Sequence, residues 1–288
     1  MHEYRRNELR NCLVLLAEHR AKRPHLKKGT RECPFCRGRE AMVPPATLEL
    51  PKGRWRVRAF PNKFPFVERR GRFAWRNGRA PAFGDHEVIV ETHEDKALFE
   101  NYSREQLNYL WSAYLDRFND FSSRKQVEFV LLLKNHGSKS GASIPHEHSQ
   151  IVSYPFVPEQ LKGFLKKPCA LCDHEKIGLT VFSTKNFRAI TPFNALTACE
   201  LWLVPKKHVS SMLEVDGAEL LEAIQECVRR LKRFDDSYNF IFVNSPRRGN
   251  LHFHVEFFTR KAVWGAVELG LGIYLNQTSP ESAKKLLG

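Results

Sequence analysis

Apolar residues follow two different spacings along this chain, and each spacing predicts one kind of element. Stripes with three-to-four spacing predict two amphipathic helices that pack in the core. The first stripe is Leu107, Leu110, Trp111, Tyr114, Leu115 and Phe118, and the second is Leu220, Leu221, Ile224, Val228 and Leu231. Short apolar runs rich in β-branched and aromatic residues predict strands at 86–91, 129–135, 199–205 and 239–244.

These elements recur in the same order in both halves of the chain. Each half has a Cys-x-x-Cys pair, an Arg-Ala turn, a Glu-led apolar strand, a helix, an apolar strand ending in Asn and a His-x-His strand. The first half runs from CPFC (33–36) to PHEHSQI (145–151), and the second from CALC (169–172) to LHFHVEFF (251–258). The main mismatch is an Arg- and Gly-rich insert at 67–84, which predicts a loop or a small hairpin. The shared order indicates a duplicated unit.

The His-x-His segments place a polar row on one face of a strand. Because a strand repeats every two residues, His146, His148 and Gln150 share a face. The second copy has the polar row His252, His254 and Glu256 and the apolar row Phe253, Val255 and Phe257. Taken alone, the first row could be an exposed polar face. Its repetition, opposite an apolar row that must be buried, predicts that both polar rows point toward a cleft.

The totals place the chain among ordinary globular proteins and indicate an anionic partner. It has 288 residues, enough for one large or two medium domains, with 42% hydrophobic residues and a formal net charge of +14. That charge favours nucleic acid or phosphorylated small molecules, unless it belongs to an ordinary solvated surface. The longest apolar run, FVLLL at 129–133, is too short to span a membrane, and the start lacks a signal-peptide core. We expect a cytoplasmic protein.

The two Cys-x-x-Cys pairs predict metal sites. Two thiolates at this spacing can bind one Zn²⁺, which needs two further ligands, and downstream histidines offer them. One set is Cys169, Cys172, His208 and His252, and the other is Cys33, Cys36 and His146, completed by Asp95 or His93. A redox pair is the competing interpretation, but neither pair opens a helix after a thioredoxin-like strand. Because protein ligands close both sites, we expect structural zinc, one or two ions per chain.

The sequence resembles the galactose-1-phosphate uridylyltransferase family of the histidine-triad superfamily. The resemblance spans nearly the whole chain. Its motifs are HRAKRP (19–24), FPNKFPF (60–66), HEVIVE (86–91), NHGSKSGASIPHEHSQ (135–150) and the tail ELGLGIYLNQTSPESAKKL (268–286).

The resemblance implies an α+β fold and a covalent reaction. Two histidine-triad-like halves, residues 1–160 with the catalytic His-x-His-x-Gln and residues 161–288, would form a mostly antiparallel open barrel with flanking helices. In a ping-pong reaction His148 would attack the α-phosphorus of UDP-glucose. Galactose 1-phosphate would then take the uridylyl group from the histidine. The resemblance also implies a homodimer.

The same resemblance assigns roles to further residues. A neutral imidazole is nucleophilic at pH 7, and its other nitrogen should be fixed by a backbone carbonyl. Gln150 would donate to a phosphoryl oxygen. The expected substrate-binding residues are Arg20, Arg23, Asn62, Asn135 and Ser143, with Lys261, Glu268 and Gln277 reaching the sugar phosphate of a neighbouring subunit. For the second half, with Glu256 in place of Gln, we expect structure without catalysis.

Two positions depart from the common uridylyltransferase block, which has Gly and Asn where this chain has Ser149 and Ile144. His-Ser-Gln also occurs in adenylyl-transferring relatives such as ADP-sugar phosphorylases, so both nucleobases stay open. The chain could also be a zinc-stabilised nucleic-acid-binding protein or a histidine-triad nucleotide hydrolase. The nucleic-acid hypothesis does not explain why the two histidines and Gln150 share one face.

Overall fold

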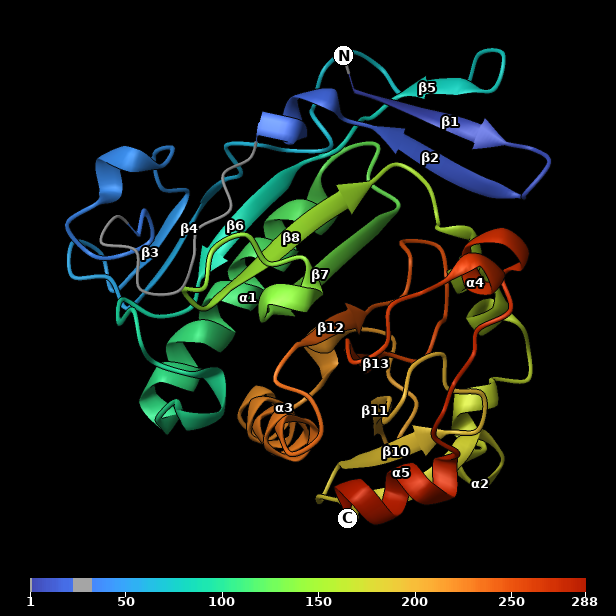
Figure 1. Cartoon of the computed structure of the whole chain (residues 1–288). Coiled ribbons are helices and arrows are strands. Elements are labelled where there is room, and N and C mark those ends of the chain that lie inside the picture. Colours follow the sequence, from blue (N-terminus) through green and yellow to red (C-terminus); the bar gives the residue numbers. More distant parts are fainter. Residues whose placement is uncertain (1, 23–32) are drawn as a thin grey trace.

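The structure, a computed structural model, describes residues 2–22 and 33–288 (Figure 1). Within them, one ten-stranded sheet and one three-stranded sheet are antiparallel throughout. The large sheet contains β3 (Leu48–Leu50), β4 (Val57–Pro61), β6 (His86–Val90), β7 (Phe129–His136), β8 (His148–Tyr154), β9 (Gly178–Ser183), β10 (Phe187–Pro192), β11 (Leu201–Pro205), β12 (Tyr238–Val243) and β13 (His254–Thr259). The small sheet contains β1 (Glu3–Asn7), β2 (Cys12–Leu16) and β5 (Arg79–Pro81).

The strand order of the large sheet reflects the repeat in the sequence. It reads β3-β4-β6-β8-β7 and then β12-β13-β11-β10-β9, so the second half repeats the first in reverse. The halves meet where β7 pairs with β12, with Leu133 opposite Ile241. Strands β3 and β9 remain as edges, so the sheet stays open. The predicted mostly antiparallel α+β fold with flanking helices is confirmed, and the sheet of the expected open barrel is not closed.

Two long helices, α1 (Arg104–Ser123) and α3 (Gly217–Lys232), pack against each other and against the large sheet (Figure 1). Both predicted apolar stripes contribute to one buried core, as expected. Each helix begins at a polar cap: Ser103 Oγ accepts from the backbone N–H of Gln106, and Asp216 caps α3 in the same way. The shorter helices are α2 (His174–Ile177), α4 (Ala266–Leu271) and α5 (Pro280–Leu287). Short 3-10 helices occur at Glu18–Lys22, Glu40–Met42, Phe99–Asn101, Ser138–Ser140, Glu159–Leu165, Ala170–Cys172 and Met212–Glu214.

The structure corrects two local predictions. Both Arg-Ala segments lie inside strands, β4 and β10, because their apolar neighbours are buried against the core. The strands β8 and β13 begin at the second histidine of each pair, so His146 and His252 precede them. The insert at 67–84 has the predicted small hairpin, where Arg76 bridges Arg79, and its strand β5 also pairs with β1. None of the helices in residues 2–22 and 33–288 is long and apolar enough to cross a membrane.

Candidate active site and metal centres

The second histidine of the first half is held by the backbone of the first. His148 Nδ1 donates a hydrogen bond to the carbonyl oxygen of His146, at 2.8 Å. A carbonyl can only accept, so the proton lies on Nδ1 and the lone pair of the neutral ring lies on Nε2. This is the backbone contact expected of a nucleophilic imidazole.

The polar row of the first half is buried, whereas the sequence predicted that it points toward a cleft. His148 is 5% exposed, and His146 and Gln150 are also buried. The ring of Phe35, from the loop between Cys33 and Cys36, lies 5.2 Å from the His148 ring in an edge-on contact. The alternating pattern could not show that this loop folds over the row.

His86 joins the predicted substrate-binding residue Asn62 to this row, although the sequence pattern did not single it out. Its Nε2 lies 2.9 Å from Gln150 Oε1 and 3.0 Å from Asn62 Nδ2. The ring of Phe66 lies 4.4 Å from the His86 ring, and the Arg20 guanidinium lies 5.3 Å from the Phe66 ring. The pairing of strands β6 and β8 could have indicated this position of His86. β6 pairs with β8 antiparallel, so His86 faces the same side as Gln150.

The other predicted substrate-binding residues lie in three places. Asn135 Oδ1 accepts from Asn239 Nδ2 across the β7–β12 pair, at 2.6 Å, and Ser143 is buried. Arg23 lies outside the described residues. The last three are in the C-terminal segment. Lys261 Nζ lies over the Phe234 ring, Glu268 accepts from the N–H groups of Gly265 and Leu275, and Gln277 is exposed.

The first predicted metal site assembles around His146. Its Nδ1 lies 3.5 Å from Cys33 Sγ, 3.7 Å from Cys36 Sγ and 3.3 Å from Asp95 Oδ1. Its Nε2 donates to the carbonyl oxygen of Thr92, at 2.8 Å, which fixes the ring with Nδ1 toward the other three residues. Asp95 completes the group, whereas His93 lies outside it and packs edge-on to Trp55.

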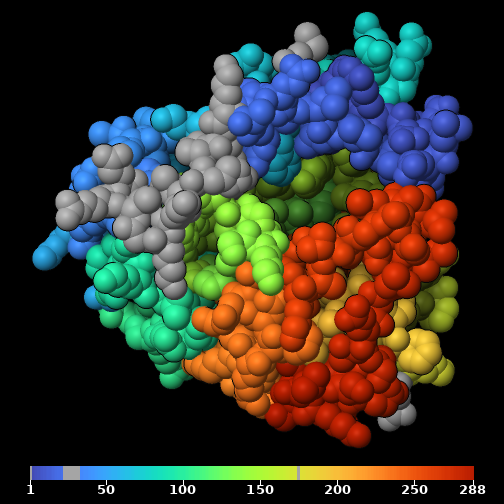
Figure 2. Space-filling model, in the orientation of Figure 1, coloured from blue at the N-terminus to red at the C-terminus, as the bar shows by residue number. Residues whose placement is uncertain are grey.

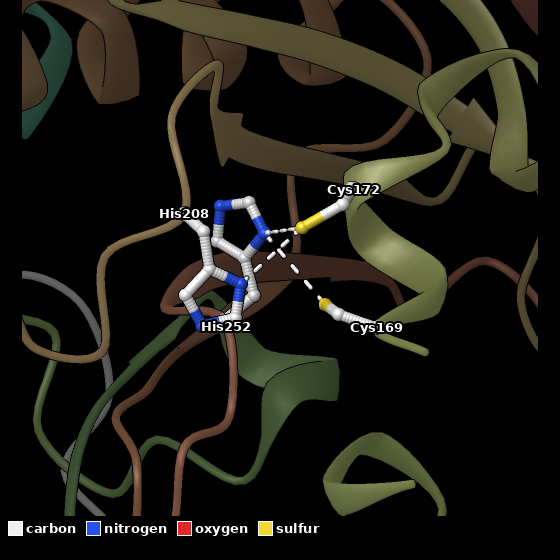
Figure 3. Close-up of side chains that lie close together, drawn as sticks. All are labelled: Cys169, Cys172, His208 and His252. Carbon is white, nitrogen blue, oxygen red and sulfur yellow. Dashed lines mark hydrogen bonds between the residues drawn. The ribbon is translucent and has the colours of Figure 1, made fainter. Parts of the chain in front are cut away.

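The second predicted site assembles in the same way (Figure 3). His208 Nδ1 lies 3.3 Å from Cys172 Sγ, and His252 Nδ1 lies 3.6 Å from the same sulfur and 3.9 Å from Cys169 Sγ. His252 Nε2 donates to the carbonyl oxygen of Pro205, at 3.1 Å. In each group the four candidate ligand atoms lie within 4.8 Å of one another. Both groups could therefore hold a metal ion.

One thiol in each group has a pKa above that of a free cysteine. Burial, aided by the neighbouring Cys33 thiol, raises the pKa of Cys36 to about 12. Burial and Cys169 raise the pKa of Cys172 to about 11. A metal ion that binds these sulfurs must displace protons, so its affinity falls as the pH falls.

Comparison with known proteins gives relatives that match over the full length of the chain. The chain is 28% identical to galactose-1-phosphate uridylyltransferase from Thermotoga maritima, over 100% of this chain and 98% of that protein. This likeness over the full length supports a protein of the galactose-1-phosphate uridylyltransferase family. It is also 24% identical to ADP-glucose phosphorylase from Arabidopsis thaliana, over 99% of this chain and 92% of that protein. These two likenesses together indicate a nucleotidyltransferase.

Solved structures show the same fold. The crystal structure of the Arabidopsis thaliana ADP-glucose phosphorylase with bound ADP-glucose matches with a TM-score of 0.80 at 24% identity, covering 100% of this chain and 98% of that one. A family model described as "Domain of unknown function (DUF4931) N-terminal domain" matches residues 62–157.

The second-half histidine is enclosed. His254 Nδ1 donates to the carbonyl oxygen of His252, at 2.9 Å, which repeats the contact of the first half. Its Nε2 lies 3.0 Å from Glu256 Oε1, and the rings of Trp202 and Phe164 pack against it. The second polar row therefore does not point into a cleft as predicted, because the aromatic rings of Trp202 and Phe164 cover His254.

Ser149, the departure from the family's usual Gly, belongs to a buried cluster on the opposite face of β8. Its hydroxyl donates to Glu91 and lies 2.6 Å from the Tyr114 hydroxyl. Nearby, Lys134 pairs with Glu91 and Glu147. Burial favours the neutral form of Glu147, but Lys134 and a hydrogen bond from His136 outweigh it and lower its pKa to about 2. Ser149 therefore complements this cluster and does not lie on the His148 face.

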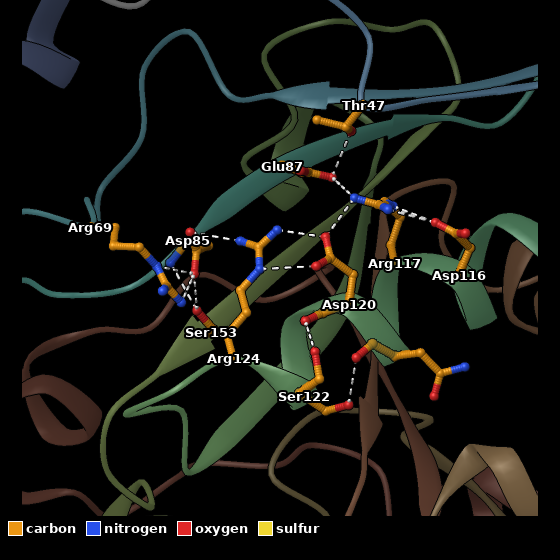
Figure 4. A network of polar contacts seen from close by, with 12 residues as sticks. Thr47, Arg69, Asp85, Glu87, Asp116, Arg117, Asp120, Ser122, Arg124 and Ser153 are labelled. Atoms are coloured by element: carbon orange, nitrogen blue, oxygen red, sulfur yellow. Dashed lines mark hydrogen bonds and ion pairs between the residues drawn. The ribbon is translucent and has the colours of Figure 1, made fainter.

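A second polar network anchors the start of β6 to α1 (Figure 4). Asp85 forms an ion pair with Arg124, at 2.7 Å, and Arg124 follows the last residue of α1. Arg117 lies 3.5 Å from Glu87. Because His86 lies between Asp85 and Glu87, its backbone is fixed on both sides.

Proposed function

We propose that this protein transfers a uridylyl group from UDP-glucose to galactose 1-phosphate through a covalent intermediate on His148. The observation that carries the proposal is the hydrogen bond from His148 Nδ1 to the His146 carbonyl oxygen. It leaves Nε2 as the nucleophilic atom of a neutral ring, so no base is needed to activate it.

The reaction has two displacements at phosphorus. In the first, the Nε2 lone pair of His148 forms a bond to the α-phosphorus, and the bond to the glucose 1-phosphate oxygen breaks. The leaving group is a phosphate monoester anion, so it needs no strong general acid. The ring keeps its Nδ1 proton, and the His146 carbonyl stabilises the positive charge that the ring acquires. In the second, an oxygen of galactose 1-phosphate attacks phosphorus and the N–P bond breaks.

The remaining predicted residues would bind the substrates. Gln150 would donate its amide N–H to a phosphoryl oxygen, supported by the His86 contact at its amide oxygen. Guanidinium groups match phosphate oxygens, which suits Arg20 and Arg23. Asn135 and Ser143 would contact the phosphates, and Asn62 would contact the ribose region. Lys261, Glu268 and Gln277 would serve the sugar phosphate in the site of a second subunit.

We further propose that Zn²⁺ binds at each Cys-x-x-Cys group and has a structural role. The donor sets suit tetrahedral zinc, and the Nε2 contacts of His146 and His252 aim each Nδ1 at the sulfurs. Zinc at the first site would hold the Cys33–Cys36 loop, and with it Phe35, against the His148 strand. No position is left open for chemistry.

The exposed apolar residues of the C-terminal segment support a homodimer. Val263, Leu269, Leu271, Ile273 and Leu275 are all more than half exposed. Arg10 Nη1, in the turn between β1 and β2, donates to the Leu269 carbonyl oxygen at 2.8 Å. The segment and this hairpin therefore form one continuous surface (Figure 2). A second copy of the chain would cover it.

A second candidate is adenylyl transfer, with phosphate as the acceptor and ADP-glucose as the donor. The full-length likeness to ADP-glucose phosphorylase favours it. Incubation with UDP-glucose or ADP-glucose, each labelled at the α-phosphorus, separates the two. Label from UDP-glucose retained on denatured protein and released by galactose 1-phosphate supports uridylyl transfer. Label from ADP-glucose alone, released by phosphate, supports the second candidate, and no label from either contradicts both.

A further inference from the structure

A charged cluster is buried on the helix-facing side of the sheet, directly behind the His148 strand. Lys134, on β7, is fully buried, and its Nζ lies 2.6 Å from Glu91 Oε2. The same ammonium group also pairs with Glu147. The other oxygen of Glu147 lies 2.8 Å from His136 Nδ1. Nothing in the proposed reaction uses these groups.

The second half of the sheet shows that the fold does not need charges at these positions. Lys134 is the register partner of Ser149, and Phe242 is the register partner of Val255. Ser149 follows His148 as Val255 follows His254, so phenylalanine replaces lysine in the second half. At the position of Glu147, between the two histidines, the second half has Phe253. Buried ion pairs seldom stabilise a fold more than apolar packing does, so this cluster calls for another role.

The cluster lies on the backbone that orients His148. Glu147 stands between His146, whose carbonyl accepts the His148 Nδ1 proton, and His148 itself. The Glu147 carbonyl accepts from the backbone N–H of Glu91, at 3.1 Å. Lys134 therefore bridges the side chains of Glu91 and Glu147, whose backbones this hydrogen bond also connects. It lies on the face of the sheet opposite the His148 imidazole.

We infer that Lys134 is a positioning residue for nucleophilic transfer: by holding Glu91 and Glu147 together, it fixes the peptide 146–148 and so the direction of the His148 ring. This inference rests on the proposed function, because it concerns the same imidazole. Lys134 does not touch the substrate, and it acts only through the peptide that presents the ring.

The variants are designed to separate positioning from stability. Lys134→Met removes the cation but leaves two buried carboxylates. Lys134→Met combined with Glu147→Gln removes one charge of each sign, and Glu91 retains the Tyr114 and Ser149 hydroxyls as donors. Lys134→Arg keeps the charge and is the conservative variant. The double variant keeps the test available if the single one fails to fold.

Rates of covalent labelling test the inference with whichever nucleotide sugar labels the wild type. We expect the folded double variant to label roughly 10- to 100-fold more slowly, because small displacements of a reacting group cost rate of this order. The KM for the nucleotide sugar should change less than about threefold, and Lys134→Arg should recover part of the rate. A double variant that labels at the wild-type rate overturns the inference.

A spectroscopic measurement keeps this test distinct from a failure of the proposed function. Nitrogen-15 spectra of histidine report the tautomer of each ring without any substrate. The wild type should show His148 protonated on Nδ1, and the double variant should show a mixture of tautomers. His254 is the matched control, because its Nδ1 makes the same hydrogen bond to a backbone carbonyl, 2.9 Å long, in the half of the sheet that lacks the charged cluster. The signal of His254 should therefore not change. An unchanged His148 signal overturns the inference even if no nucleotide labels the protein.

Discussion

The carbonyl oxygen of His146 lies 2.8 Å from Nδ1 of His148, so the backbone of one histidine sets the tautomer of the next. The His146 side chain meanwhile points to Cys33, Cys36 and Asp95. One tripeptide thus contributes both to a candidate metal group and to the candidate nucleophile. Loss of the metal should alter the orientation of the His148 ring. Transfer activity should therefore fall as the metal content of the protein falls.

The two metal groups should differ in affinity. The second offers two thiolates and two imidazoles, whereas Asp95 takes the place of an imidazole in the first. Borderline-soft Zn²⁺ favours sulfur and nitrogen ligands, so a chelator should remove zinc from the first group before the second. Native mass spectrometry during chelator titration measures this order. Asp95→His should raise the zinc affinity of the first site toward that of the second, and Asp95→Ala should lower it further. Loss from the second site first would contradict the assignment.

Gly217, the first residue of α3, should not tolerate a side chain. A Cβ atom there would lie 2.0 Å from ring atoms of Trp111 on α1, so the two helices would have to move apart. We expect Gly217→Ala to lower the free energy of unfolding by about 1–3 kcal/mol, as for other overpacked sites. Urea denaturation measures it. Gly163→Ala is the matched control, because a Cβ atom there meets nothing within 4 Å. Equal effects of both substitutions would argue against this helix contact.

Glu200 should make stability depend on pH. Burial raises the pKa of Glu200 from 4.5 to about 7, although the N–H of Thr197 and the Trp202 indole favour its ionised form. The folded state thus holds a proton that the unfolded state releases above pH 4.5. This contribution is complete below pH 4.5 and is lost as the pH rises to about 7, a loss of roughly 3 kcal/mol. Denaturation of Glu200→Gln and wild type across this range should give a steeper fall for the wild type. Parallel curves would show that Glu200 does not carry this effect.

The exposed apolar residues of the C-terminal segment should be covered in a dimer. Light scattering of the wild type should give twice the mass of one chain. The substitutions Leu269→Glu and Leu271→Glu place charges in the proposed interface, so they should dissociate the dimer into monomers. Leu213→Glu is the control, because Leu213 is also exposed but lies in a different segment. A monomeric wild type would contradict the proposed dimer.

The repeat made the fold predictable, because the same order of strands and helices had to build two similar units. Periodicity located α1, α3 and the central strands. It failed at the Arg-Ala segments, where strand pairing decides the conformation and local sequence does not. Strand pairing also aligns the two halves differently by one residue from the order of sequence motifs. Glu87 pairs with Ile151 and Leu201 pairs with Phe257, so Glu87 is equivalent to Leu201 and not to Glu200.

The candidate site was predictable where spacing along the chain dictates geometry. Both metal groups follow from the Cys-x-x-Cys pairs and the histidines downstream, and only the choice between Asp95 and His93 needed coordinates. Side chains brought from other elements were not predictable. Phe35 over His148, His86 beside Gln150 and the charges around Lys134 all depend on tertiary packing, which periodicity does not encode.

Covalent capture of the nucleotide on His148 is the decisive measurement for the proposed transfer. Enzyme would be incubated with nucleotide sugar labelled at the α-phosphorus, denatured, digested and analysed by mass spectrometry. We expect one nucleotidyl group on His148, none in His148→Asn, and wild-type labelling in His254→Asn, the matched histidine of the second half. Label that persists in His148→Asn, or label that is lost only in His254→Asn, would show that His148 is not the nucleophile.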